Sequence, residues 1–418
     1  MPQLYPGEKL ETIASFPTLY RFLPAKKQGN GHSNNDNKPL VIFIPGMALL
    51  ARVGYGAHKG YNRRDFLAYW LNELGYDVLG VSYPMEMQES SNKAEGEGQD
   101  KESDESGSSG FRQMSHCPGF NPHDMGEQVA QTARKVIDKE RLASNKIIVA
   151  VWSMSGKLLK PLVSSAETHG LDLRLFLSLA ATPSGIKGLN YSPPQIHASR
   201  AGFAALSESA LLRGSRQMQA QNIRQEGNGI VDVDTIRHEY FGHTPVGLTN
   251  AGLVYKKSQA NDGENTGTST STNEKFHFAH ATLADFAVTE PGNYDDTIHY
   301  PYIAAIRPTS PTDLRHSLTD AAAWGIFLTI KLTVEVAGVI GNKLRQMQES
   351  DHEDDVWHTV QTLVSSAPGR LTSKIVHGNH MFFMGETGAR MTAEGIDELH
   401  REAENIRGEL KMLLKHWD

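Results

Sequence analysis

The chain of 418 residues contains a single cysteine, Cys117, which excludes an internal disulfide and favours a reducing, cytoplasmic compartment. Cys117 lacks the Cys-x-x-Cys or histidine-rich spacing of a zinc site, so we predict neither a metal nor an organic cofactor. Basic residues are not in excess: 41 Lys and Arg against 48 Asp and Glu give a net charge of −7. We therefore expect no nucleic-acid partner.

Targeting and membrane signals are also scarce. The first ten residues carry Pro2, Pro6 and Glu8 and lack the apolar core of a secretory signal, so export is not expected. Residues 321–341 are strongly apolar but contain Lys331 and Glu335, four positions apart. Two central charges are costly in lipid and ordinary at the edge of a packed helix. This stretch therefore predicts a helix buried within the chain or in a homodimer, and no stable membrane span.

The stretch around residue 153 carries the main chemical signal. The apolar run 147–151 reads as a strand buried on both faces, and it stops at Trp152 before a turn and a helical pattern. Such a sharp turn projects one hydroxyl above a sheet and aims the next backbone N–H at a developing oxyanion. The layout predicts Ser153 as a nucleophile; the plainer interpretation is a strand followed by a helix with a capping serine.

The stretch resembles the nucleophile elbow of the α/β-hydrolase superfamily, Gly-x-Ser-x-Gly, with Val151 and Ser155 in the two glycine positions. Ser155 fits less well as the nucleophile, because Lys157 would then occupy the second small position. The turn Pro45-Gly46-Met47 after the apolar strand 39–44 is similar to the family's oxyanion turn. The resemblance implies backbone N–H donors from Met47 and Met154.

The same resemblance assigns the base. Residues 372–376 predict a last short strand, and Gly378-Asn379-His380-Met381-Phe382 after it is similar to the segment that carries the family's histidine. An imidazole with a pKa near neutrality suits the removal of a serine proton. His380 is therefore the predicted base, and His377, at the end of the strand, is the competitor with a more structural position.

The acid is the least defined member. The family places it after the strand that we expect at residues 301–306, where Asp313 is the nearest carboxylate. Asp313 comes later than usual and could instead cap the following helix, while Ser310 occupies a position closer to the expected one. The triad could be incomplete, or the acid could be one of four earlier carboxylates, Asp285, Glu290, Asp295 and Asp296.

The order of strands and helices predicts an α/β fold with a mostly parallel central sheet flanked by helices, since strand, helix and strand alternate over residues 39–83. An antiparallel pair, 11–16 and 18–23, is expected to turn at Pro17. We expect a first core part at 1–189 with a disordered insertion at 86–113, a cap at 190–297 with a low-complexity tract at 258–273, and a second core part at 298–418.

These features together predict a cytoplasmic serine hydrolase or acyl transferase. The expected substrate is an ester, lactone or thioester of a mainly apolar small molecule. Two alternatives stay open: the same fold running a lyase, isomerase or cyclase reaction, such as those of natural-product metabolism, and a non-catalytic binding protein.

Overall fold

The computed structural model describes residues 3–26, 38–87, 119–181, 183, 202–204, 208–223, 230–249, 253–257, 276–280, 300–340 and 355–415. The predicted insertion beyond residue 87 and the tract 258–273 lie outside these residues. The first two residues of that insertion are ordered: Glu86–Met87 form a short strand, β5, that pairs with β8 (Gly242–His243).

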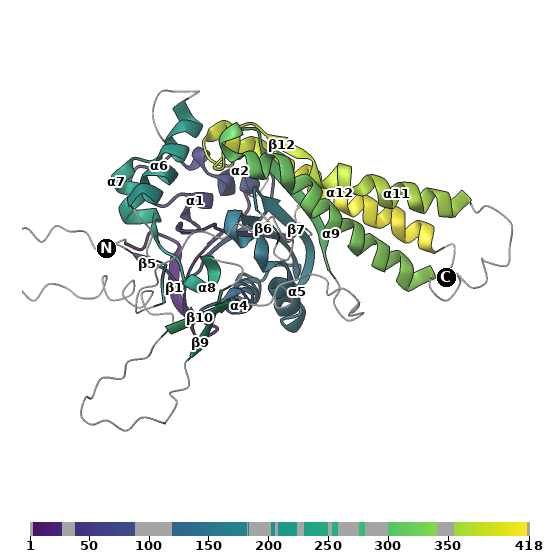
Figure 1. Ribbon diagram of the computed structural model, residues 1–418, viewed down its shortest axis with the longest axis horizontal. Helices are drawn as coiled ribbons and strands as arrows, with labels where there is room; N and C mark the ends of the chain where they lie inside the picture. Colours follow the sequence, from purple (N-terminus) through teal and green to yellow (C-terminus); the bar gives the residue numbers. More distant parts are fainter. Residues whose placement is uncertain are drawn as a thin grey trace, which may run out of the picture.

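One eight-stranded sheet organises the molecule (Figure 1), in the order β1-β2-β4-β3-β6-β7-β11-β12. Its strands are β1 (Glu8–Ile13), β2 (Phe16–Leu23), β4 (Val78–Ser82), β3 (Leu40–Ile44), β6 (Lys146–Trp152), β7 (Asp172–Leu179), β11 (Tyr302–Pro308) and β12 (Lys374–Val376). The β1–β2 and β2–β4 pairs are antiparallel, and all further pairs are parallel. The predicted mostly parallel sheet is confirmed.

The turn of the first hairpin differs from the prediction. It lies at Ala14 and Ser15, with φ angles of 50° and 68°, and Pro17 is inside β2 opposite Thr12. Two consecutive left-handed residues match the twist of a two-residue hairpin. The expectation at Pro17 was wrong because Ala-Ser carries none of the usual Asn-Gly or Asp-Gly signal.

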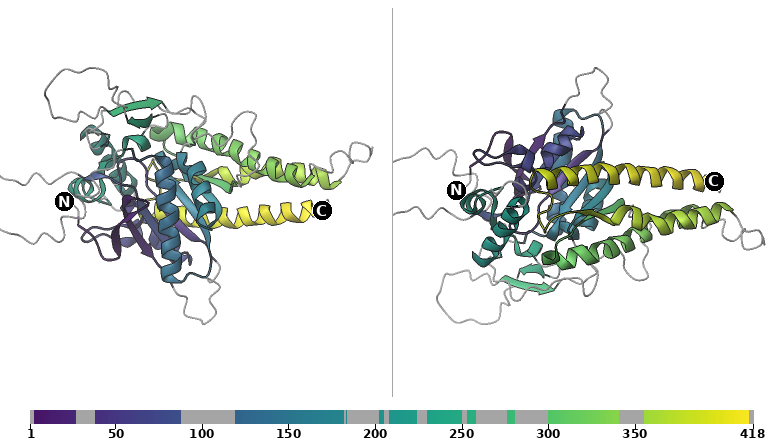
Figure 2. Two further views of the ribbon diagram at one scale, coloured as in Figure 1. Left: turned by 90° about the horizontal axis from the view of Figure 1, so that it is seen from below. Right: turned by 90° about the horizontal axis from the view of Figure 1, so that it is seen from above.

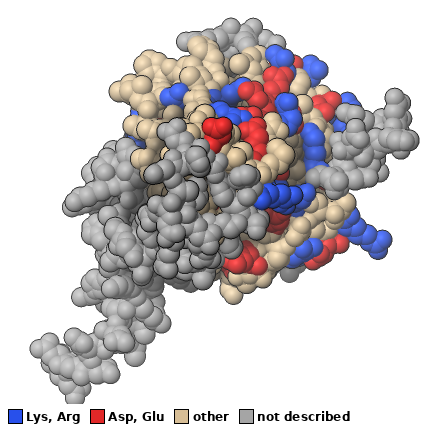
Figure 3. Space-filling model, turned by 90° about the vertical axis from the view of Figure 1, so that its right-hand side faces the viewer, with Lys and Arg blue, Asp and Glu red and all other residues tan. Residues whose placement is uncertain are grey.

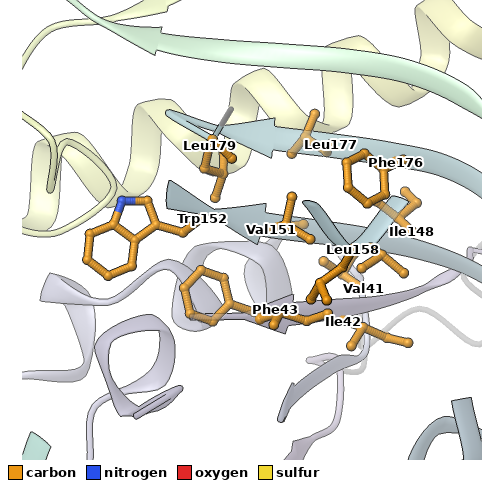
Figure 4. Close-up of a cluster of buried hydrophobic side chains, with 14 of the residues drawn as sticks. Val41, Ile42, Phe43, Ile148, Val151, Trp152, Leu158, Phe176, Leu177 and Leu179 are labelled. Carbon is orange, nitrogen blue, oxygen red and sulfur yellow. The ribbon is translucent and has the colours of Figure 1, made fainter. Parts of the chain in front are cut away.

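Helices cover both faces of the sheet (Figure 2). The helices α4 (Pro122–Glu140) and α5 (Leu159–Thr168) pack against one face, and α2 (Leu67–Glu73) and α12 (Glu386–Leu414) pack against the other. Figure 4 shows the resulting core between β3, β6 and β7, where Val41, Phe43, Val151, Phe176 and Leu179 are all almost fully buried. A strand buried on both faces explains the unbroken apolar runs in the sequence.

The helices α9 (Leu314–Ile340), α11 (Asp355–Thr372) and α12 extend together beyond the sheet (Figure 1). The helical stretch Pro311–Ile340 has the length and hydropathy of a membrane span, but 44% of its apolar window is buried. Trp324 is fully buried against Phe176 and donates to the carbonyl of Ala181, and Lys331 pairs with Glu335 at 2.9 Å. Figure 3 views the molecule from the side towards which these helices extend, and on the described surface there Lys and Arg side chains lie among Asp and Glu side chains. Through Trp324 one face of α9 packs against the sheet, while Leu318, Ile326 and Val334 of the same helix are exposed.

The described parts of residues 190–297 lie along the carboxyl edge of the sheet and near its first strands. They comprise α6 (Glu208–Ile223), α7 (Val233–Thr235), the π-helical turn η3 (Ile236–Tyr240), β8, α8 (Val246–Thr249), β9 (Leu253–Lys257) and β10 (Phe276–His280). Two buried polar contacts fasten this segment to the core. Arg52, in α1 (Arg52–Tyr55), contacts Glu239 at 3.0 Å, and Lys157 donates to the carbonyl of Leu248 in α8.

Arg52 also holds the first strand. Its side chain is fully buried and makes two hydrogen bonds with Glu8 of β1, at 2.8 and 2.7 Å. The other Glu8 contacts come from the hydroxyl of Tyr55 at 2.7 Å and the N–H of Tyr5 at 2.9 Å. A buried charge that loses its partner is strongly destabilising, because its desolvation is no longer compensated.

We predict that Glu8→Gln lowers the free energy of unfolding by about 3 kcal/mol, because it removes the fully buried counter-charge of the Arg52 guanidinium and leaves only the partly exposed Glu239 carboxylate beside it. Urea denaturation followed by circular dichroism measures the change. The matched control is Glu11→Gln on the same strand, whose ion pair with Lys135 is partly exposed and should contribute less than about 1 kcal/mol. Equal losses in the two variants would contradict this account.

Lys157 gives a pH-dependent prediction. Its amine is almost completely buried, and burial lowers its pKa from 10.5 to about 7. Between these two values the unfolded chain binds a proton that the folded chain does not, so folding becomes more favourable as the pH rises. Relative to Lys157→Met, the wild type should gain up to about 1.4 kcal/mol of stability per pH unit from pH 7 towards 10.

Urea denaturation of both proteins across this pH range provides the measurement, and the difference between them cancels other titrations. The control is Lys160→Met on α5, whose lysine is less buried. Stability differences that do not change with pH would refute the depressed pKa of Lys157.

Candidate active site

Ser153 occupies a strained turn at the carboxyl end of the central strand β6. It is the first residue of a 3-10 helix, η2 (Ser153–Leu158), and its φ angle is 53°. A non-glycine residue in the left-handed region costs on the order of 1–3 kcal/mol, and such residues concentrate at functional sites. The side chain is half-buried. The structure therefore places the Ser153 hydroxyl at the predicted strand-to-helix turn.

The two departures from the elbow pattern have structural explanations. Val151 is fully buried in β6 and lies in register with Ile44 on one side and with the small Ser178 on the other. The close approach occurs instead at Gly46, where a Cβ atom would lie 2.8 Å from Ser153 Cβ. The glycine that this turn requires is thus supplied by the turn after the neighbouring strand β3.

Ser155 is buried, and its hydroxyl donates to the carbonyl of Pro45 at 2.5 Å. This hydrogen bond joins the elbow to the turn that follows β3. Because the hydroxyl already has an acceptor and little exposure, the geometry favours Ser153 over Ser155 as the reacting serine.

The predicted oxyanion donors lie on this same pair of turns. The Tyr83 hydroxyl donates to the Gly46 carbonyl at 2.6 Å, and in a trans peptide the N–H of Met47 points the opposite way. Thr244 accepts the N–H of Ala48 at 2.8 Å and holds the next peptide. Met154 is the second residue of η2, where backbone N–H groups have no helical partner. Sequence reasoning missed Tyr83 and Thr244, because neither belongs to a recognisable motif.

His380 and Asp313 lie together. The His380 Nδ1 and the Asp313 Oδ2 are 2.7 Å apart, and both side chains are mostly buried. Burial alone would raise the pKa of the Asp313 carboxyl, but the hydrogen bond and charge of His380 lower it below its ordinary value. Asp313 therefore remains a carboxylate at neutral pH and orients the ring, which leaves Nε2 for proton transfer.

The position of Asp313 follows from a short turn after β11. The 3-10 helix η5 (Pro311–Asp313) is capped by Ser310, whose hydroxyl accepts the N–H of Thr312 at 3.2 Å. Ser310 is thus the cap, and the carboxylate is free to reach His380. The four earlier carboxylates considered as alternatives, Asp285, Glu290, Asp295 and Asp296, lie outside the described residues.

Trp152 brings the histidine loop to the elbow. Its indole N–H donates to the His380 carbonyl at 3.0 Å, and the two rings are 5.2 Å apart. Within the described part of the chain, no hydrogen bond joins Ser153 to His380, and such bonds are often long before substrate binds. His377 instead contacts the Thr309 hydroxyl at 2.9 Å, which links the histidine loop to the loop after β11.

A second histidine and carboxylate, which the sequence analysis did not single out, lie beside this pair. The His316 ring stacks on His380 with centroids 4.9 Å apart, and its Nδ1 contacts both oxygens of the fully buried Asp320 at 3.2 Å. His316 and Asp320 are on α9, three and seven residues after Asp313. This spacing places them on one face of the helix. That spacing was the available signal.

Asp313, His316 and His380 offer ligand atoms within 4.8 Å of one another, a separation compatible with a metal site. The imidazoles, however, stack at an interplanar angle of 30°, so their in-plane lone pairs do not converge on one point. Each Nδ1 atom also contacts a carboxylate. In this arrangement the residues are better suited to proton transfer than to metal coordination.

A cavity of about 320 Å³ lies next to these loops, between α6, the loop after β11 and the start of α12. Hydroxyl and amide groups line much of it, including Thr309, Thr312, Asn379 and Thr387. Neither Ser153 nor His380 lines this cavity.

Comparisons with known proteins find matches among solved structures alone: no family model and no curated protein matches the chain. An arylesterase structure is similar over 95% of this chain and 84% of its own, at 10% identity and a TM-score of 0.37. A NocB thioesterase domain was solved as a covalent complex with a fluorophosphonate nocardicin G analog. It is similar over 91% of this chain and 98% of its own, at 10% identity and a TM-score of 0.34.

A puromycin-hydrolysing peptidase from Mycobacterium tuberculosis is similar over 44% of this chain, at 10% identity and a TM-score of 0.28. The chain spans 23% of that protein's length. The fold assignment rests on the molecule itself: the mixed sheet, the strained serine turn after a central parallel strand, and the chain order serine, aspartate, histidine. The chain has the α/β-hydrolase fold.

Proposed function

We propose that the protein is a serine hydrolase or acyl transferase in which Ser153 is the nucleophile, His380 the base and Asp313 the acid. The observation that carries the proposal is the 2.7 Å contact between His380 and Asp313, beside a serine held at a φ of 53°. A serine hydroxyl needs an adjacent base, and the base needs a third group to orient it. The contact between His380 and Asp313 supports the second requirement, and the contact of Trp152, the residue before Ser153, with His380 supports the first.

In the proposed reaction, Ser153 Oγ attacks the acyl carbonyl carbon while its proton passes to His380 Nε2. The carbonyl oxygen becomes an oxyanion, which the Met47 and Met154 N–H groups stabilise. Collapse of this intermediate breaks the bond to the leaving alcohol or thiol, which takes the proton from His380. Water then repeats the sequence on the acyl enzyme and releases the acid, or a second alcohol accepts the acyl group.

Apolar side chains around the turn support an ester, lactone or thioester of a mainly apolar molecule. Met47 is 40% exposed beside the elbow, and Trp152 and Met154 flank Ser153 in the chain. We further propose that residues 190–297 act as a cap. This role is supported by α6, where Gln221 accepts the N–H of Asn379 at 3.1 Å and the Gln217 carbonyl accepts its side-chain amide at 2.8 Å.

A fluorophosphonate, which phosphonylates activated serines, tests the nucleophile. We expect the wild type to gain one adduct by intact-mass spectrometry, Ser153→Ala to gain none, and Ser155→Ala to keep the adduct at a lower rate because a hydrogen bond to Pro45 is lost. Absence of labelling in the wild type would overturn the proposal and favour a binding role. Turnover that neither incorporates oxygen from ¹⁸O-water nor acylates an added alcohol would favour a lyase, isomerase or cyclase.

The role of Asp313 gives a second prediction. Asp313→Asn should slow labelling at Ser153 by about 10⁴-fold, because an amide cannot hold the reactive tautomer of His380. The control is Ser310→Ala, which removes the cap of the same turn without changing its charge and should slow labelling less than about tenfold. Similar rates for Asp313→Asn and the wild type would assign the acid to another carboxylate.

A further inference from the structure

We propose that His316 and Asp320 form a second histidine and carboxylate pair that positions His380 and stabilises its protonated form. This inference rests on the proposed function, because His380 acquires a proton only if it serves as the base. His316 and Asp320 touch neither the serine nor the predicted oxyanion turn in the described contacts, so they are positioning residues.

The geometry gives the second pair a rigid platform. Asp320 is fully buried on α9, and its oxygens both contact His316 Nδ1 at 3.2 Å. This contact fixes the His316 ring, which is itself only 8% exposed. The fixed ring stacks on His380 at 4.9 Å and 30°, while Trp152 contacts the same ring at 5.2 Å.

Two aromatic neighbours and one carboxylate therefore define the plane of His380. Rotation of an imidazole by a small angle moves Nε2 away from the serine hydroxyl, and loss of such alignment is costly for catalysis. Asp313 alone restrains one edge of the ring, whereas the stack restrains its face. The second pair completes the restraint.

Charged groups of both signs surround His380. Five ionisable groups face one another: Asp313 from η5, Arg315, His316 and Asp320 from the first turns of α9, and His380 from the loop after β12. Arg307 of β11 lies beside them and donates to the Ser317 carbonyl at 2.5 Å. Burial raises the pKa of Asp320, while the hydrogen bond from His316 opposes this rise. A second carboxylate near His380 stabilises the imidazolium that forms when Ser153 is deprotonated.

A merely structural pair would not need this position. The partly buried pair of His169 and Glu127, with a separation of 2.6 Å, joins the end of α5 to α4, has no described contact with His380 and provides a matched comparison. If His316 only filled space at the start of α9, neither His316→Phe nor Asp320→Asn would change the titration midpoint of His380.

The test is a pH titration of the histidine ring carbons by NMR, with ¹³C-labelled histidine and with the His380 signal assigned from His380→Gln. The full chain is compared with Asp320→Asn, His316→Phe and the control His169→Gln. We expect the His380 midpoint to fall by about half a pH unit or more in both cluster variants, because the stabilising carboxylate is removed or left to take up a proton. The control should leave the midpoint unchanged.

The rate of fluorophosphonate labelling is then followed against pH in the same proteins. In Asp320→Asn and His316→Phe, the acidic limb of the plot of labelling rate against pH should move to lower pH together with the NMR midpoint. The maximum labelling rate of these two variants should fall about tenfold. Unchanged midpoints in folded Asp320→Asn and His316→Phe would overturn the inference, even if labelling slows. Shifted midpoints without any labelling of the wild type would instead refute the serine hydrolase and leave the coupling of the two pairs standing.

Discussion

The left-handed backbone of Ser153 is the constraint on which the site depends. It costs on the order of 1–3 kcal/mol, and a turn with this conformation would relax if its surroundings allowed it. The surroundings do not, because β6 is buried between β3 and β7, and Gly46 leaves no room for the turn to shift. The hydrogen bonds from Ser155 to Pro45 and from Trp152 to His380 hold its two sides.

Parallel strands explain why distant segments meet at this turn. The carboxyl ends of β3, β6, β11 and β12 lie at one edge of the sheet, so the loops after them are neighbours although they are separated by up to several hundred residues. The turn that carries Met47, and the residues Ser153, Asp313 and His380, each follow one of these strands. The long helix α9 contributes twice, because its first turns carry His316 and Asp320 and its middle packs on the sheet through Trp324.

Much of the fold and part of the site were predictable from local patterns. Apolar runs predicted the central strands, and the resemblance in motif order led to Ser153, His380 and Asp313, of which the structure brings His380 and Asp313 into contact. The hairpin turn was misplaced because Ala14 and Ser15 adopt left-handed angles that their residue types rarely signal. Asp313 and Ser310 could not be separated, since the choice depends on a single 3-10 turn that sets which side chain reaches His380.

By itself the sequence determined the alternation of buried strands and helices and the strand-to-helix turn at Ser153, since each depends on residues close together in the chain, and its single cysteine excluded an internal disulfide. Tertiary structure decided the pairing of His380 with Asp313, the use of Gly46 as the small residue of the elbow and the stacking of His316 on His380. These are contacts across the sheet edge between residues far apart in sequence. Periodicity and spacing carry no information about such contacts, because they arise only when the strands have taken their order in the sheet.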